Sequence, residues 1–144
     1  MTAAAGSPRW LLDTNVLAEP LRPVPAPAVL RRLRNHQGEL AIPVTVWQEL
    51  HFGWLRMPPG QRRERVGDYL RTTVARLPVL ALDATAARLQ AELRWHAEQA
   101  GRPMSYPDSA IAAVAVAHAA TLVTRNVRDF ENRPGVVCTD WFQS

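Results

Sequence analysis

Short apolar runs alternate along this chain with longer stretches in which apolar residues recur every three or four positions. The short runs are typical of buried strands and the longer stretches of amphipathic helices. The pattern predicts strands over residues 9–13, 39–43, 78–83, 121–124 and 136–139. It predicts helices over residues 26–38, 44–57, 61–77, 84–101 and 106–120.

This alternation of strands and helices predicts the fold class. Strands joined by helices form βαβ units, so we expect an α/β fold with a parallel sheet covered on both faces. Gly38 and Gly101 are expected to end helices, Asp83 to cap one, and Pro107 to lie in a first turn. The proline-rich segment 19–28 is interpreted as a loop, and residues 1–144 as a single domain.

Composition narrows the cellular setting. The lone cysteine, Cys138, fits a reducing compartment and is interpreted as a buried, inert thiol. The N-terminal residues lack the pattern of a signal peptide, and the longest apolar stretch, 110–120, is too short to span a bilayer. We therefore expect a soluble, cytoplasmic protein with no membrane partner.

The charge balance points weakly to a nucleic-acid partner. The formal net charge is +4, the sequence pI is about 10.5, and all 17 basic residues are arginine. A general preference for arginine codons accounts for part of this bias. A basic surface with guanidinium groups nevertheless attracts phosphate-rich polyanions.

Acidic and amide side chains lie where the predicted strands end. Asp13 directly follows the first strand, and Asn126 and Asp129 follow the fourth. Glu49 lies on the helix after the second strand, and Asp108 begins the helix that leads into the fourth. Because ligands of open parallel sheets bind at the carboxyl ends of the strands, these residues could converge on one edge.

Each of these residues also has an ordinary structural interpretation. Asp13 and Asp108 could favour helix N-termini, Glu49 could be solvated surface, and Asn126 and Asp129 could shape a turn. Carboxylates crowded at one site would instead repel each other and need a cation. Oxygen ligands favour Mg²⁺ or Mn²⁺.

Other catalytic chemistries find little support in the sequence. Ser109 lacks a G-x-S-x-G context, and no glycine-rich phosphate loop is present. His118, in the alanine-rich helix, is interpreted as a structural histidine. The histidines are scattered without zinc-ligand spacing, at His36, His51, His96 and His118.

The segments that carry the acidic residues resemble a known family as an ordered set. "LLDTNVLAEPLRP", "TVWQELHFGW", "YPDSAIAAVAVAHAATLVTRNVRDF" and "TDWF" are similar to PIN-domain ribonucleases of the VapC toxin type, from Trp10 to Trp141. The resemblance implies a PIN-like three-layer α/β/α sandwich with a central parallel sheet. It also implies an endoribonuclease that uses Mg²⁺, or Mn²⁺, held by an acidic cluster.

The family's acidic positions carry over residue by residue. Asp13 matches the first, Glu49 the second and Asp108 the third. Where many members have aspartate after "TR", this chain has Asn126, which is given an orienting role. Asp129 then becomes a substitute ligand acting through water, and one metal ion or two remain open.

The expected reaction is hydrolysis of an RNA phosphodiester by activated water, without a protein nucleophile. Thr14 is expected to support Asp13 or a metal-bound water. Arg125 and Arg128 are candidates for holding the RNA backbone, with ordinary surface charge as an equal alternative. The family implies transfer RNA or ribosomal RNA as the target, and nothing in the sequence selects one.

The resemblance also implies protein partners. A cognate VapB-type antitoxin would lie over the active site through its C-terminal segment. Homodimers, and larger toxin–antitoxin assemblies that reach operator DNA through the antitoxin, are expected. Trp47 and Trp54 share a helical face and either belong to the core or include a residue of the antitoxin groove.

Four other classes of protein are compatible with parts of this pattern. Haloacid-dehalogenase phosphatases and response-regulator receivers also place aspartate after the first strand, but both need a lysine, which this chain lacks. The phosphatases also need a second aspartate where Asn15 stands. A PIN-like module that binds RNA without cutting it is supported by Asn126 alone, and a DNA-directed metal nuclease is a weaker rival.

Overall fold

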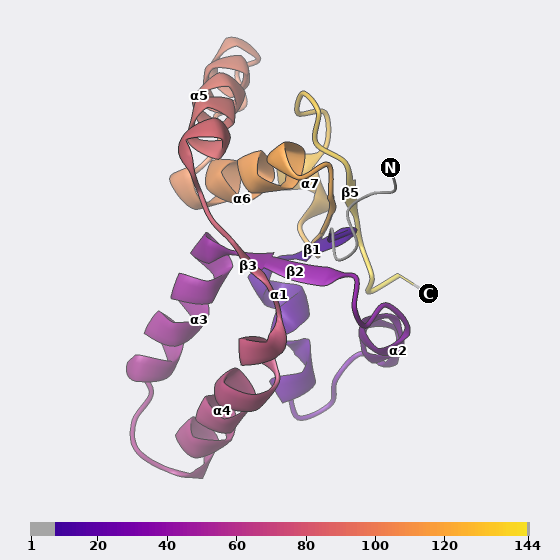
Figure 1. The fold of residues 1–144 in the computed structure, drawn as a ribbon, viewed down its shortest axis with the longest axis vertical. Coiled ribbons are helices and arrows are strands. Elements are labelled where there is room, and N and C mark those ends of the chain that lie inside the picture. The colour runs from indigo at the N-terminus through magenta and orange to yellow at the C-terminus, as the bar shows by residue number, and fades with distance from the viewer. Residues whose placement is uncertain (1–7, 144) are drawn as a thin grey trace.

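A five-stranded parallel sheet forms the centre of the computed structural model, which describes residues 8–143 (Figure 1). The strand order is β3-β2-β1-β4-β5, and every neighbouring pair is parallel. β1 therefore lies in the middle, although it comes first in the chain. The strands are β1 Trp10–Leu12, β2 Leu40–Pro43, β3 Val79–Leu80, β4 Thr121–Val123 and β5 Cys138–Thr139.

Helices cover both faces of this sheet. Figure 1 shows α1, α2 and α4 on one side and α5, α6 and α7 on the other, while α3 contacts both α4 and α6. The helices are α1 Thr14–Leu17, α2 Pro27–Asn35, α3 Val44–Leu55, α4 Gln61–Thr72, α5 Ala84–Gln99, α6 Tyr106–Ala117 and α7 Val127–Phe130. Two short 3₁₀ helices are η1 Glu19–Leu21 and η2 Val74–Arg76. The expected three-layer α/β/α sandwich is confirmed.

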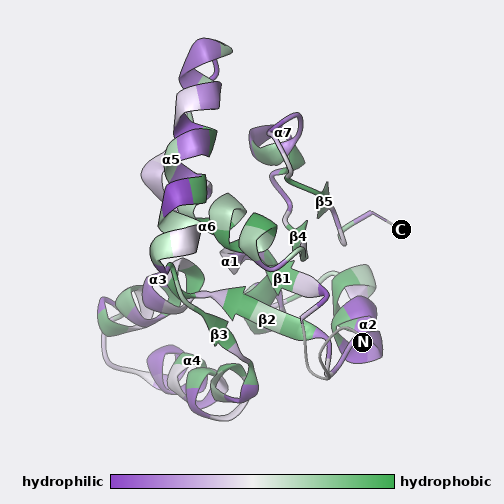
Figure 2. Cartoon of the chain, turned by 45° about the horizontal axis from the view of Figure 1, so that its top comes forward, coloured by the Kyte–Doolittle hydropathy of each residue, from purple (hydrophilic) through white to green (hydrophobic). Residues whose placement is uncertain are grey.

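The core lies on both faces of the sheet, and α6 is the helix with the longest buried segment in it. Figure 2 shows apolar strands β1 and β2 beside an apolar α6, whereas α5 is polar along much of its length. In α6, all residues from Ser109 to Ala115 are buried. Small alanine and valine side chains let this helix lie close against the strands, which positions its first turn at the sheet edge.

Turn and cap predictions agree with the structure. Gly38 and Gly101 have φ angles of +89° and +69°, the left-handed conformation that ends α2 and α5. The Asp83 carboxylate accepts a 2.9 Å hydrogen bond from the Ala86 N–H at the start of α5. Pro107 lies in the first turn of α6.

Several predicted boundaries were wrong. The helix predicted over residues 61–77 ends at Thr72, whose hydroxyl donates to the Asp68 carbonyl, and η2 follows. α1, η1 and α7 were not predicted, because helices of three or four residues are too short to show a periodicity. Every predicted strand is shorter in the structure.

Two side-chain predictions also need correction. His118 is not in the core: it is exposed at the C-cap of α6. Cys138 is half-buried rather than buried, although burial and then Glu131 raise the pKa of its thiol, which keeps it protonated. Within residues 8–143, no helix has the length and apolarity needed to cross a membrane.

Candidate active site

Two of the segments predicted to converge follow adjacent strands of the sheet. β1 leads into Asp13 and β4 leads into Thr124, and the two strands pair in parallel at the centre. The Asp13 N–H donates to the Val123 carbonyl at 2.9 Å, so the two strand ends are joined directly. The candidate site therefore lies at the carboxyl edge of the sheet, where ligands of open parallel sheets bind.

Asp13 is a buried carboxylate with both oxygens engaged. It is 7% exposed. Its Oδ1 accepts from the Thr14 N–H at 2.8 Å and its Oδ2 from the Thr124 hydroxyl at 2.8 Å. Asp13 is thus the N-cap of α1, as its ordinary interpretation predicts, and it places a carboxylate at the carboxyl edge of the sheet.

Burial raises the pKa of Asp13, and the Asp129 carboxylate raises it further, although the bonds from Thr124 and Thr14 oppose these effects. A buried anion with a like-charged neighbour is stabilised by any bound cation.

Glu49 is connected to this carboxylate through Thr14. The Thr14 hydroxyl donates a hydrogen bond to Glu49 Oε2 at 3.0 Å, while the Thr14 N–H donates to Asp13 Oδ1. Thr14 thus contacts Asp13 through its backbone only, and its side chain holds Glu49. The half-buried Glu49 is therefore oriented by α1 rather than free on the surface of α3.

Asp108 comes to the same region on the first turn of α6. The Ser105 hydroxyl caps this helix by accepting from the Asp108 N–H at 3.1 Å. Burial raises the pKa of Asp108, and the carboxylates of Asp129 and Asp13 raise it further. Three aspartates from three segments therefore share one electrostatic environment.

These carboxylates do not form a ready-made coordination shell. In the part of the chain that the structure describes, no group of three or more His, Cys, Asp or Glu side chains is arranged to hold a metal ion. The donors are oxygen atoms, which suit hard cations. Mg²⁺ is commonly bound through one or two carboxylates with several waters retained, and that sparse requirement matches this arrangement.

Thr124 is a site residue that the sequence reasoning missed. It is fully buried, donates to Asp13 and accepts from the Asn126 N–H at 3.0 Å. Asn126 is exposed, and its side chain makes no capping bond at the start of α7. The only sequence signal for Thr124 was a hydroxyl residue directly after an apolar strand.

Two arginines join the segments that carry Asp108 and Asp129. Arg133 donates through Nη1 to the Arg102 carbonyl (2.7 Å) and through Nε to the Asp129 carbonyl (3.2 Å). Arg102 donates in return to the Arg128 carbonyl at 2.8 Å and the Glu131 carbonyl at 3.4 Å. We call Arg102 and Arg133 the arginine clasp.

The clasp also brings positive charge to the site. Arg133 is 9% exposed, and its guanidinium lowers the pKa of Asp108, opposing the carboxylate effects. Sequence reasoning missed both arginines, because nothing in the spacing of residues 102 and 133 indicates contact.

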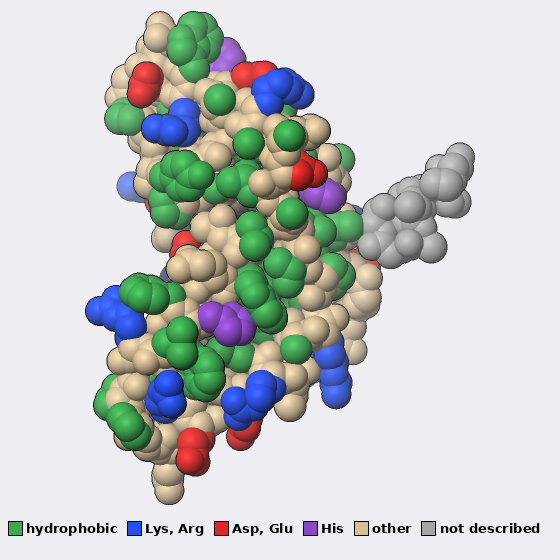
Figure 3. Space-filling model, turned by 60° about the vertical axis from the view of Figure 1, so that its left-hand side comes forward, with side chains coloured by type: hydrophobic (Ala, Val, Ile, Leu, Met, Phe, Trp, Pro, Cys, Tyr) green, Lys and Arg blue, Asp and Glu red, His purple; other side chains and the backbone are tan. Residues whose placement is uncertain are grey.

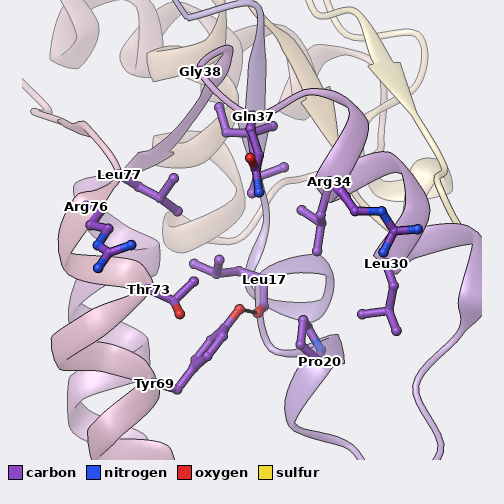
Figure 4. Close-up of a pocket in the computed structure, with 13 residues that line it drawn as sticks. Leu17, Pro20, Leu30, Arg34, Gln37, Gly38, Tyr69, Thr73, Arg76 and Leu77 are labelled. Carbon is purple, nitrogen blue, oxygen red and sulfur yellow. Dashed lines mark hydrogen bonds between the residues drawn. The ribbon is translucent and has the colours of Figure 1, made fainter.

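Two hollows in the structure have none of the acidic site residues in their lining. The larger, about 590 Å³, lies between α2, α4 and the sheet and is shown in Figure 4. Its lining is mainly apolar, with the exposed Arg34 and Arg76 among the polar residues. A smaller one of about 250 Å³, between α3 and α4, is lined by both Trp47 and Trp54.

Comparison with known proteins gives one family. The PIN domain family model matches residues 10–135. A tRNA(fMet)-specific endonuclease VapC from Shigella flexneri is 32% identical over 133 residues, covering 92% of this chain and 98% of that protein.

Solved structures agree with this match. FitAB bound to an IR36 DNA fragment superposes with a TM-score of 0.86 at 26% identity, covering 94% of this chain and 96% of that one. VapBC-5 from Mycobacterium tuberculosis, a member of the VapBC family of toxin–antitoxin systems, gives a TM-score of 0.71 at 27% identity, covering 92% and 99%.

Proposed function

Because this chain belongs to the PIN-domain family and resembles its VapC ribonucleases over nearly its whole length, we propose that it is the toxin of a type II toxin–antitoxin pair. Its activity is that of an endoribonuclease, which hydrolyses RNA phosphodiester bonds. The observation that carries the site assignment is the hydrogen-bonded arrangement at the carboxyl edge of the sheet, where Thr14 and Thr124 hold the buried Asp13 and Thr14 also holds Glu49. Asp108 and Asp129 raise the same local negative potential.

The acidic residues provide the oxygen ligands for Mg²⁺ or Mn²⁺. Asp13 and Asp108 would hold the ion, with Glu49 directly or through water. Such an ion, when bound, lowers the pKa of a coordinated water and stabilises charge on the phosphoryl oxygens.

The remaining residues orient these groups and the substrate. Thr124 and Thr14 fix Asp13 and Glu49 through the bonds described above. Asp129, exposed beside them, holds a water by accepting its hydrogen bond. Arg125, exposed in the loop before α7, and Arg128, exposed on α7, both contact the RNA strand, and Arg128 does so through a phosphate. Transfer RNA and ribosomal RNA are the substrate classes to test first.

A VapB-type antitoxin is the proposed partner, and the larger hollow is its proposed docking site. Figure 4 shows Leu17 of α1 among the lining residues. Leu12, which directly precedes Asp13, also lines the hollow, so the hollow reaches the segment that carries Asp13. An apolar antitoxin segment with acidic residues facing Arg34 and Arg76 fits this lining. Operator DNA would be reached through the antitoxin.

A charge-reversal variant can show whether the antitoxin binds at this docking site or at the hollow lined by Trp47 and Trp54. Replacing Arg76 with Glu should weaken antitoxin binding, measured by calorimetry, and leave RNA cleavage intact. If Arg76→Glu binds normally while tryptophan fluorescence changes on complex formation, the α3–α4 hollow is the docking site instead.

Cleavage of total cellular RNA tests the activity. Wild-type protein should give discrete fragments with Mg²⁺ or Mn²⁺ and none with EDTA, and Asp108→Asn should lose at least about a hundredfold in rate, as removal of a charge-stabilising group does. Arg88→Met, on the exposed face of α5, is the control and should cut normally. A wild-type protein that binds RNA but leaves it intact would favour the non-catalytic module that Asn126 supports.

A further inference from the structure

Arg125 is held beside the acidic residues with its guanidinium stacked on an aromatic ring. Its N–H donates to Asn15 Oδ1 at 3.1 Å, so its backbone is fixed to α1. Its guanidinium carbon lies 4.6 Å from the centroid of the Phe142 ring. A planar guanidinium on an aromatic face has one face covered and the other free to stack or to bind phosphate.

The ring beneath Arg125 is itself anchored. The Phe142 N–H donates to Asp140 Oδ1 at 2.7 Å. Arg32, from α2, donates to the carbonyls on either side of Phe142: to Trp141 at 2.9 Å and to Gln143 at 2.6 Å. The stacked pair is therefore fixed in place before any ligand arrives, which lowers the entropic cost of binding.

A hollow of about 380 Å³ opens beside Arg125, within the usual size range of ligand pockets. It is lined by Arg125, Asn126, Val127, Arg128 and Asp129. Among residues 8–143, neither Arg125 nor Arg128 forms an ion pair with a carboxylate. Arg125 offers a flat guanidinium face for stacking, Arg128 a cation for phosphate and Asn126 an amide. These groups suit a nucleotide, because it combines an anion with a flat base.

We propose that Arg125 and Phe142 form a nucleotide subsite for unpaired RNA next to the bond that is cut. An unstacked base packs on the open face of the Arg125 guanidinium, and Arg128 holds an adjacent phosphate. Asp129 lines the hollow and also couples to Asp13 and Asp108, so the bound nucleotide adjoins the acidic residues. Bases within a duplex are stacked on one another and cannot enter. This subsite rests on the proposed ribonuclease function and adds how the substrate is selected.

Binding measured without cleavage tests the subsite. In EDTA, a fluorescently labelled unpaired oligoribonucleotide should bind Phe142→Leu about tenfold more weakly than wild type, as expected for the loss of one stacking contact. Phe142→Tyr keeps the ring and should bind within about twofold of wild type. A labelled RNA duplex should bind all three proteins alike.

A matched pair elsewhere controls for the loss of an aromatic ring. Phe52 on α3 carries the Arg56 guanidinium at 5.2 Å, and Phe52→Leu should leave RNA binding unchanged. With metal, Phe142→Leu should raise KM and leave kcat near wild type, because the stacking contact acts in both ground and transition states.

The outcomes separate the two proposals. If Phe142→Leu and wild type bind the unpaired RNA equally while wild type cuts RNA, the subsite is wrong and the ribonuclease stands. If Phe142→Leu weakens duplex binding as strongly, selection for unpaired RNA is wrong. If wild type neither binds nor cuts RNA, both proposals fall.

Discussion

Asp13 shows how one residue can serve both the fold and the site. It caps α1 and accepts from Thr124 across the central strand pair, 111 positions away in the chain. Its position after an apolar strand was enough to predict a role at the sheet edge. The hydroxyl that holds it could not be predicted, because its partner depends on which strand pairs with β1.

Thr124→Ala should weaken both stability and activity. It removes two hydrogen bonds and leaves a buried carboxylate oxygen less satisfied, so the free energy of unfolding should fall by about 1–2 kcal/mol in urea titrations. RNA cleavage should fall as well, since Asp13 is no longer oriented. Thr124→Ser keeps the hydroxyl and should recover most of both; equal losses in the two variants would show that the methyl group matters instead.

The pKa directions at the site predict how metal affinity depends on pH. The pKa values of Asp13 and Asp108 lie above the ordinary 3.8 in the metal-free protein. Protons therefore compete with the cation at a higher pH than at an ordinary carboxylate site. Mn²⁺ affinity measured by calorimetry should fall several-fold as the pH is lowered toward these raised values. A Mn²⁺ affinity that stays unchanged down to pH 4 would contradict the assignment.

The raised pKa values of Asp13 and Asp108 also predict that the Asp108→Asn variant is more stable than the wild type. In the metal-free protein the native state holds protons more tightly than the unfolded chain, so these groups make stability fall as pH rises through the raised pKa values. Removing one charge should therefore raise the Tm of the metal-free protein at pH 7, measured by thermal unfolding. Mn²⁺ should raise the Tm of the wild type and have little effect on the variant.

At the scale of elements, the sequence predicted the long helices correctly, although several predicted element boundaries were wrong. Long periodic stretches gave α2, α3, α5 and α6 close to their observed limits, because each buries one face against the sheet or a neighbouring helix. Strand ends were less predictable, since they depend on where partner strands stop. β3 pairs through only two residues at the edge of the sheet.

The arginine clasp makes the α5–α6 loop and α7 act as one unit. Arg133→Met keeps the aliphatic stem but loses both donated bonds, and it should lower the free energy of unfolding by about 1–3 kcal/mol. Arg102→Met should cost less, because Arg102 is exposed. The double variant should show a coupling of about 0.5–1 kcal/mol in urea titrations, whereas Arg88→Met should add independently to either.

At the scale of the whole molecule, the parallel topology explains why the acidic site was predictable and its supports were not. Parallel strands end at one edge wherever they lie in the chain, so carboxylates after strands meet there. The clasp and the Arg125–Phe142 pair depend instead on the paths of loops, which carry no periodic signal.

The face formed by α3 and α5 is our proposed contact with a second copy of the chain. Figure 3 shows apolar side chains spread over this face, and Leu55 and Trp95 are 60% and 57% exposed. In size-exclusion chromatography with light scattering, this proposal expects the wild type to elute as a dimer and Trp95→Glu as a monomer. Val24→Glu, at another strongly exposed position, should not; an unchanged dimer in Trp95→Glu would exclude this face.

The central position of β1 has a consequence for synthesis. β1 pairs with β4, and Asp13 gains its Thr124 bond only when residues near the end of the chain are present. A chain still emerging from the ribosome can assemble β1, β2 and β3, but its long-range contacts come last. The acidic site that we propose as the nuclease centre is therefore completed late, so a nascent chain carries Asp13 and Glu49 before Asp108 and Thr124 are in place.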